Sequence, residues 1–281
     1  MLPHGTGILL GRNSPYNSPP SAKGKGRVRL LDQIKESPGF ATGLRLSAGD
    51  LGKVKGVVKR HLADQLNRTA PDQVGRFVAT PLEQYHSIAH QLPHSDMLTR
   101  TARILPKWAV DEIRATSLTR LLESEFGPFE ISDEERIGRE SISIRVVRPD
   151  METDVGSLHA DEWFWELYKF DLPKGKQRIK VWVAICCEPG KSGLLLSPES
   201  HKRQWKYNTF TRAGMLKPLL DSEQSPKLEL FNSEPGDAVA FNYKLLHGGA
   251  VTRGSITRVS MEFTILVPDR VYFAKRAERV N

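Results

Sequence analysis

The chain has 281 residues, of which 39% are hydrophobic, and its mean hydropathy is −0.41. This length allows a sizeable core, and no apolar run approaches the roughly 20 residues of a membrane span, so the composition excludes a membrane protein. The net charge of +8 is unevenly placed, because five basic residues and no acidic one precede Asp32. The rest of the chain is nearly neutral, which argues against a nucleic-acid partner.

Residues 1–31 form a basic leader rich in Ser, Pro and Gly, a composition typical of a flexible tail. Its apolar stretch at 8–10 is too short for a secretory signal, and the basic residues follow that stretch. The only cysteines, Cys186 and Cys187, are adjacent and offer neither a disulfide framework nor a zinc spacing. These features predict a cytoplasmic protein and leave the oligomeric state open.

Residues 32–138 carry mainly helical signals. A first helix is expected after a cap at Ser47 or Asp50, with apolar residues at helical spacing. A second is expected over 106–126, from a proline suited to a first turn to a Gly-Pro pair that ends the helix. This region should support the rest of the fold.

Residues 139–268 contain short β-prone runs bounded by Pro, Gly, Asn or Asp. The runs cover 141–147, 179–187, 194–197, 227–231, 238–246 and 257–267. Helices followed by strands, without alternation, predict an α+β fold in which helices brace an antiparallel sandwich or barrel. We expect a single domain over 32–281, with a tail at 269–281.

A His-x-Asp pair occurs at His159 and Asp161. On an extended chain, residues two apart point to the same face, so an imidazole and a carboxylate could reach one ion. A second such pair, His94 and Asp96, follows a proline in the helical region, where we expect a loop or helix start with Asp96 as N-cap. Only the first pair is predicted to bind metal.

Support for the first pair comes from a β-prone run that ends at His247, followed by two glycines. Two histidines and one carboxylate suit Fe(II), because they leave positions open for further ligands, whereas structural zinc favours four protein ligands. The glycines would let the backbone pass close to the metal without a Cβ. The sequence therefore predicts an iron site of His159, Asp161 and His247.

Arg258 and Ser260 follow His247 on another β-prone run and, two residues apart, should share a face. A guanidinium beside a hydroxyl can hold a carboxylate through charge-assisted hydrogen bonds. This arrangement makes 2-oxoglutarate the expected co-substrate, with its far carboxylate on Arg258.

Together these residues resemble the Fe(II)/2-oxoglutarate-dependent dioxygenases, especially the phytanoyl-CoA dioxygenase-like branch, over about 141–267. The separation of 88 residues between the two histidines is typical of that branch. Residues 192–202 are similar to its Gly-x-Leu…Gly-Ser-His segment, although Glu199 stands where the family usually has glycine. The resemblance implies a double-stranded β-helix core braced by N-terminal helices, use of O2, and release of succinate and CO2 during oxidation of a small molecule, usually hydroxylation.

Secondary candidates surround these residues. Arg145 could reach the other carboxylate of 2-oxoglutarate, or could be an exposed strand arginine. Trp163 is the preferred substrate contact, although an aromatic residue there could also be core. His201 is assigned to a structural turn. Lys180 and Val181 fall on opposite faces of one strand, and the sequence does not decide which face looks inward.

Two other functions share parts of this pattern. A nucleic-acid demethylase of the AlkB type uses the same triad but has a second arginine six residues after the first, where this chain has Thr264. A cupin-like sugar-binding protein or isomerase would have no need for Arg258 and Ser260. The substrate and the position oxidised stay open.

Overall fold

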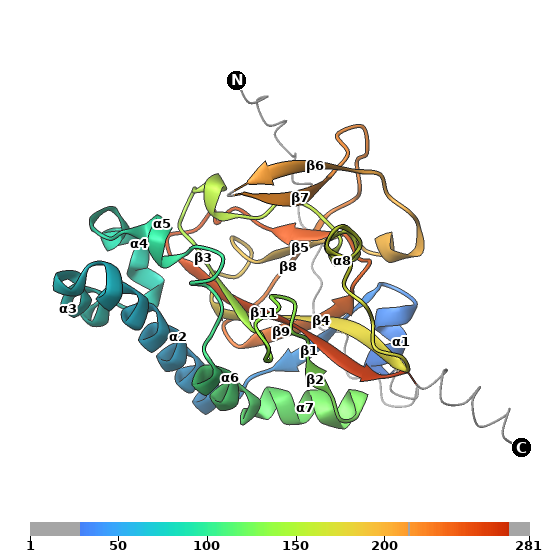
Figure 1. Cartoon of the computed structure of the whole chain (residues 1–281), viewed down its shortest axis with the longest axis horizontal. Coiled ribbons are helices and arrows are strands. Elements are labelled where there is room, and N and C mark those ends of the chain that lie inside the picture. The colour runs from blue at the N-terminus through green and yellow to red at the C-terminus, as the bar shows by residue number, and fades with distance from the viewer. Residues whose placement is uncertain (1–28, 213, 270–281) are drawn as a thin grey trace, which may run out of the picture.

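The computed structural model describes residues 29–212 and 214–269. A large antiparallel sheet faces a smaller one, and helices cover the outer side of the large sheet (Figure 1). A separate two-stranded hairpin lies beyond the small sheet, at the top of Figure 1. This is the expected α+β arrangement of helices around a double-stranded β-helix core.

The large sheet places the N-terminal strand beside strands from the far end of the chain. Its order is β1 (Phe40–Arg45), β9 (Asp237–Asn242), β4 (Lys176–Cys186), β11 (Arg258–Pro268) and β2 (Glu130–Ile131), and β3 (Ser143–Val147) also pairs with β11. The small sheet has the order β10 (His247–Gly249), β5 (Leu194–Leu196) and β8 (Glu229–Phe231), and the hairpin consists of β6 (Tyr207–Arg212) and β7 (Met215–Leu220).

Helices α2 (Ala48–Thr69) and α7 (Ser117–Phe126) lie against the large sheet, and α3 (Val74–Ala79) and α6 (Lys107–Arg114) pack on α2 (Figure 1). Their apolar faces form one core with Val181 and Val183 of β4. Because side chains alternate along a strand, Lys180 and Trp182 then face the space between the sheets. Tertiary packing thus decides which face of β4 looks inward.

The other helical segments of the described chain are short. They are α1 (Leu30–Lys35), α4 (Tyr85–Ile88), α5 (His94–Met97) and α8 (Asp161–Tyr168), with 3-10 turns at Pro71–Gln73, Leu82–Gln84, Ala89–Gln91, Glu152–Asp154 and Ser200–Lys202. None of the described helices has the length and apolar character needed to cross a bilayer. The predicted leader lies almost wholly outside the described residues, as does the predicted tail beyond Asp269.

The start of α2 matches its predicted cap. Ser47 is the N-cap, and its hydroxyl oxygen accepts a hydrogen bond from the backbone N–H of Asp50 at 3.1 Å. The Asp50 carboxylate accepts from the Ser47 hydroxyl at 2.9 Å and from the backbone N–H of Ser117 at 2.8 Å. Asp50 therefore joins the starts of two helices.

The helix predicted over 106–126 is two helices. α6 ends at Arg114 and α7 begins at Ser117. The Thr116 hydroxyl donates to the carbonyl oxygen of Ile113 at 2.7 Å, the kind of local side-chain bond that competes with helix continuation. At the other predicted end, Gly127 stops α7 with a φ of 87°.

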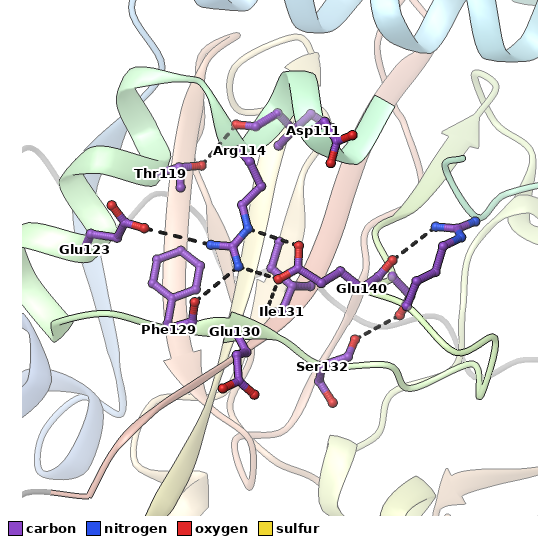
Figure 2. A network of polar contacts seen from close by, with 12 residues as sticks. Asp111, Arg114, Thr119, Glu123, Phe129, Glu130, Ile131, Ser132 and Glu140 are labelled. Carbon is purple, nitrogen blue, oxygen red and sulfur yellow. Dashed lines mark hydrogen bonds and ion pairs between the residues drawn. The ribbon is translucent and has the colours of Figure 1, made fainter. Parts of the chain in front are cut away.

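Contacts at this break join the helices to β2 (Figure 2). Arg114 donates from Nε to the carboxylate of Glu140 at 3.1 Å and from Nη2 to the carbonyl of Phe129 at 3.1 Å. The same Glu140 accepts from the backbone N–H of Ile131 at 3.0 Å. Ending α6 at Arg114 thus lets its side chain hold the edge of the large sheet.

Other boundaries also differ from the predictions. β1, β6 and β7 were not expected, and β1 shows that the region before residue 139 contributes to the large sheet as well as bracing it. The run over 238–246 ends as a strand at Asn242, and His247 begins the separate β10. Asp96 lies inside α5, whose N-cap is Pro93, so the Asp96 cap is wrong although the predicted helix start is present.

Candidate active site

Backbone pairing brings the two predicted histidine ligands together. The N–H of His159 donates to the carbonyl of His247 at 3.0 Å, and the N–H of His247 donates to the carbonyl of His159 at 2.9 Å. β10 is held in turn by β5, where His247 lies opposite Leu196. The small sheet therefore positions both histidines.

Asp161 reaches the histidines by a different route from the one predicted. Ala160 is extended, but Asp161 is the first residue of α8, so the pair does not lie on one continuous strand. Nevertheless, Asp161 Oδ1 lies 3.8 Å from His159 Nε2, and its Oδ2 lies 3.9 Å from His247 Nε2. One potential ligand atom from each of the three residues lies within 4.8 Å of the other two.

Hydrogen bonds to backbone carbonyls fix the orientation of both imidazoles. His159 Nδ1–H donates to the Ser157 carbonyl at 2.7 Å, and His247 Nδ1–H donates to the Leu245 carbonyl at 2.9 Å. These carbonyls leave each Nε2 lone pair directed toward Asp161. Burial lowers the pKa of both histidines to about 4, so both are neutral at pH 7.

The donor set fits a ferrous ion. Asp161 Oδ2 is buried and has no hydrogen-bond partner among the described residues. A buried carboxylate oxygen without a partner is unfavourable unless a cation satisfies it. Two neutral nitrogens and this oxygen form the two-histidine, one-carboxylate set that suits Fe(II).

Lys180 is a further charge at this cluster. Its buried ammonium lies 3.7 Å from Asp161 Oδ1 and 3.5 Å from Glu134 Oε2. Burial opposes its charge, but Asp161 and Glu134 outweigh that effect and raise the pKa of Lys180. Sequence reasoning did not assign this role, although a lysine within an apolar strand is a detectable signal; nothing in the sequence indicated Glu134.

Arg258 and Ser260 share the inward face of β11, as predicted. Arg258 is fully buried, and its Nη1 donates to the Ser260 hydroxyl at 3.3 Å. The Nε and Nη2 atoms of Arg258 are buried without a hydrogen-bond partner among the described residues. Burial, reinforced by Arg145, lowers the pKa of Arg258 to about 9. The pair has the donors and the charge to receive a carboxylate.

One glycine after His247 makes room for this arginine. A Cβ on Gly249 would lie 3.0 Å from Arg258 Nη2, closer than an ordinary contact. A Cβ on Gly248 would instead meet the backbone of Leu158 at 3.4 Å. The close approach expected at these glycines is therefore to neighbouring protein groups.

Arg145 lies on β3 opposite Ser260 and lines the same cavity. Its Nη2 is 3.9 Å from Glu262 Oε1. Burial would raise the pKa of Glu262, but Lys180 and Arg145 outweigh it and lower that pKa to about 2. Glu262, two residues beyond Ser260 on β11, adds a negative charge beside the histidines.

Trp163 does not contact the cavity, which corrects its predicted role. It packs with Ala160, Leu220 and Leu246 and stacks on Tyr207 with a centroid distance of 4.7 Å. The next two aromatic residues, at 164 and 165, line the cavity instead. The reason is that α8 begins at Asp161, so successive side chains are distributed around a helix.

The cavity has a volume of about 720 Å³ and contains the triad, Arg258 and Glu262 in its walls. His94, from the other His-x-Asp pair, also lines it, bonded to the Tyr85 hydroxyl through Nδ1 at 2.8 Å. Asp96 is not among the lining residues. The second pair thus contributes one wall residue and no ligand set.

The segment around His201 is structural, as expected. His201 Nε2–H donates to the carbonyl of Lys35 at 3.1 Å, and the residue does not line the cavity. Glu199, which stands at the family's usual glycine, has a φ of 62°. Glycine adopts this left-handed conformation without strain, whereas a residue with a Cβ such as glutamate does not.

Fold and site define a metal-dependent enzyme built on a double-stranded β-helix. The phytanoyl-CoA dioxygenase (PhyH) family model matches residues 110–260, more than half of the chain. The chain belongs to this family. It is a 2-oxoglutarate-dependent non-haem dioxygenase, with Fe(II), 2-oxoglutarate and O2 as its metal and co-substrates. Among curated proteins, none matches the chain.

Several solved structures are similar to the chain at low sequence identity. EvdMO1 is 14% identical with a TM-score of 0.50, and the match covers 86% of this chain and 51% of that one. SnoK, a non-haem α-ketoglutarate-dependent carbocyclase from nogalamycin biosynthesis, is 11% identical with a TM-score of 0.49, covering 85% and 83%. EctD from S. alaskensis, solved with 2-oxoglutarate and 5-hydroxyectoine, is 14% identical with a TM-score of 0.48, covering 82% and 72%.

Proposed function

We propose that His159, Asp161 and His247 hold the ferrous ion and that the enzyme hydroxylates a small molecule bound in the cavity, releasing succinate and CO2. The observation that carries this proposal is a pair of complementary unsatisfied groups in one cavity. These groups are a buried carboxylate oxygen on Asp161 and buried guanidinium donors on Arg258. The unpaired carboxylate oxygen would be stabilised by a bound cation, and the unpaired guanidinium donors by a bound anion.

In this proposal, Arg258 and Ser260 bind the far carboxylate of 2-oxoglutarate. The hydrogen bond between their side chains sets the direction of the guanidinium. A guanidinium in a site without water binds a carboxylate strongly, because both partners are charged. Arg145, which is paired with Ser260 on the neighbouring strand, is proposed to bind the other carboxylate of 2-oxoglutarate.

Bound iron and 2-oxoglutarate would together supply the oxidising power for O2 activation. The protein's own residues provide the geometry. The carbonyls of Ser157 and Leu245 hold the two imidazoles with Nε2 inward. Burial raises the pKa of Asp161, and Lys180, 3.7 Å from its Oδ1, opposes this shift and favours the charged carboxylate. Phe164 and Trp165 contribute apolar surface to the cavity wall, against which the carbon skeleton of a substrate could pack.

The other two functions receive less support. A second guanidinium of the AlkB type would have to occupy position 264, where Thr264 is buried on the inward face of β11. A cupin-like binding protein would leave the buried donors of Arg258 unused. We further propose that residues 32–281 form one catalytic domain, because a single core joins the helices to the large sheet. The buried free thiols of Cys186 and Cys187 are compatible with the proposed cytoplasmic location.

The test is an anaerobic titration of the protein with Fe(II) and 2-oxoglutarate, following the weak visible charge-transfer band of the iron chelate. Wild-type protein should develop the band at one iron per chain, and His159→Ala should not. Admission of O2 should then yield succinate from 2-oxoglutarate. Failure of wild type to develop the band would remove the proposed ligand set.

A further inference from the structure

Two strands of the β6–β7 hairpin present basic side chains to the cavity. Arg212 on β6 lies opposite Met215, and Lys217 on β7 lies opposite Phe210. All four of these side chains line the cavity. Arg103, from the turn just before the bridge between Ile104 and Ser143, lines it as well. The hairpin and this turn form one wall.

The cavity walls have a net positive charge that the proposed metal and co-substrate would not neutralise. Eight cationic and five acidic side chains line it. Each of the five acids lies 3.9 Å or less from one of four cations: Arg100, Arg145, Arg148 and Lys180. A ferrous ion and the 2-oxoglutarate dianion would cancel one another and leave an excess of three positive charges.

Arg258 is assigned to the co-substrate, so the cations still without an acidic partner among the described residues are Arg103, Arg212 and Lys217. Arg212 donates to the carbonyl of Thr153 at 2.9 Å, which fixes one arm of its guanidinium. Lys217 lies over the ring of Phe164, with Nζ 5.3 Å from the centroid. Arg103 Nε is buried without a hydrogen-bond partner among the described residues.

These like charges act on one another. Burial together with Arg145 and Arg212 lowers the pKa of Arg103 to about 10, and Glu262 and Glu135 offset only part of this shift. Burial together with Arg100 and Arg103 lowers the pKa of Lys217, and Glu135 offsets only part of that shift. Both pKa shifts result from partial burial and from repulsion between neighbouring cations. A bound anion would reduce that repulsion.

Building on the function proposed above, we propose that Arg103, Lys217 and Arg212 bind an oxyanionic group of the substrate, and specifically a phosphate monoester. Guanidinium groups match the oxygens of phosphates and carboxylates through paired N–H donors. A phosphate monoester carries about −1.5 to −2 charges at pH 7, so it compensates the local excess better than a single carboxylate does. The substrate is therefore a phosphorylated small molecule whose reacting carbon lies toward the triad.

The experiment measures binding of phenyl phosphate and of benzoate to the full chain loaded anaerobically with Fe(II) and 2-oxoglutarate. Calorimetry at constant ionic strength in chloride buffer gives both affinities. Phenyl phosphate should bind wild type more tightly than benzoate. The visible iron–2-oxoglutarate band, recorded in the same samples, should persist, which excludes displacement of the co-substrate by the phosphate.

The variants are Arg103→Gln/Lys217→Gln and, as a charge-matched control, Arg45→Gln/Lys107→Gln, whose side chains are outside the cavity and 52% and 75% exposed. The cavity pair should weaken phenyl phosphate binding by more than about tenfold, while the control should change it less than about twofold. Retention of the visible band in each variant shows that fold and cofactor site are intact.

Three results would overturn the proposal while leaving the cofactor site established: no binding of either anion to band-positive wild type, equal affinities in the cavity and control variants, or loss of the band on adding phosphate. Tighter binding of benzoate, sensitive to the cavity variants, would support the oxyanion site and overturn its phosphate preference. Absence of the band in wild type would count against the proposed function itself.

Discussion

His159 and His247 exchange two backbone hydrogen bonds, of 3.0 and 2.9 Å, although 88 residues separate them in the chain. Main-chain pairing therefore sets the distance between the two backbone positions that carry the imidazoles. Replacing either side chain should remove a proposed metal ligand while leaving the backbone pair intact.

We expect His247→Ala to lower Fe(II) affinity by more than about 100-fold, because only two of three protein ligands remain. His90→Ala, at an exposed histidine, should bind one iron like wild type. Equilibrium dialysis of anaerobic protein against Fe(II) measures both. Undiminished iron binding by His247→Ala would exclude this histidine as a ligand.

Replacing Arg258 should separate co-substrate binding from metal binding. Arg258→Gln removes a charge-assisted carboxylate contact, so the 2-oxoglutarate concentration at half-saturation should rise by about 10- to 100-fold. Ser260→Ala removes one neutral partner and should raise it only a few-fold. Iron affinity should change little in either variant. Equal effects of the two substitutions on 2-oxoglutarate would contradict the proposed division of roles.

Lys180→Met should destabilise the metal-free protein, because it leaves two buried or partly buried carboxylates, on Asp161 and Glu134, without their cation. A loss of about 2–4 kcal/mol is expected in the free energy of unfolding. Saturating Fe(II) should restore part of this loss, since the metal would take over Asp161. Lys176→Met, on the same strand but paired with exposed Glu130, is the control.

Urea unfolding with and without Fe(II) measures this coupling. An identical loss in both states would show that Lys180 does not compensate the charge of Asp161.

Asp154 should stabilise the fold in a pH-dependent way. Burial alone would raise its pKa, but hydrogen bonds from Arg148, at 2.8 Å and 2.9 Å, and from His94 hold that pKa well below 3.8. Because the folded-state pKa is the lower one, the stabilisation is complete above about pH 4 and is lost as the pH falls further. Asp154→Asn should therefore be less stable by about 1–3 kcal/mol at pH 7.

The difference in free energy of unfolding between wild type and Asp154→Asn should stay constant from pH 7 to about 4 and become smaller below that. Urea unfolding at several pH values measures this difference. Asp72→Asn, at an exposed aspartate, should show no comparable difference. A difference in free energy of unfolding that grows toward low pH would contradict a lowered pKa of Asp154.

Substitutions of Glu199 test whether its left-handed backbone conformation strains the turn. Glu199→Gly should be more stable than Glu199→Ala by about 1 kcal/mol, because alanine keeps a Cβ at a φ of 62°. Both substitutions remove the same surface contact to Lys202, so the comparison isolates backbone conformation. Thermal unfolding of the two variants measures the difference. If alanine were as stable as glycine, the turn would not be strained.

Several features could be predicted locally. The cap at Ser47, the stop at Gly127 and the alternation that places Arg258 beside Ser260 all depend on interactions within a few residues. The break after Arg114 was missed because the contacts that favour it come from Phe129 and Glu140. β1 was missed because its strand partner, β9, lies about 200 residues further along the chain.

The sequence alone determined the class of chemistry expected of this protein, because residue types at a short spacing, a distant histidine and an arginine on a β-prone run limit which ion and co-substrate they could hold. Tertiary structure decided which side chains share the cavity. The start of α8 at Asp161 turned Trp163 into the core, and the hairpin brought Lys217 and Arg212 to Arg103. Ligand chemistry is a property of individual residues, whereas a cavity wall depends on the pairing of distant segments, which is fixed only when the sheets and helices pack.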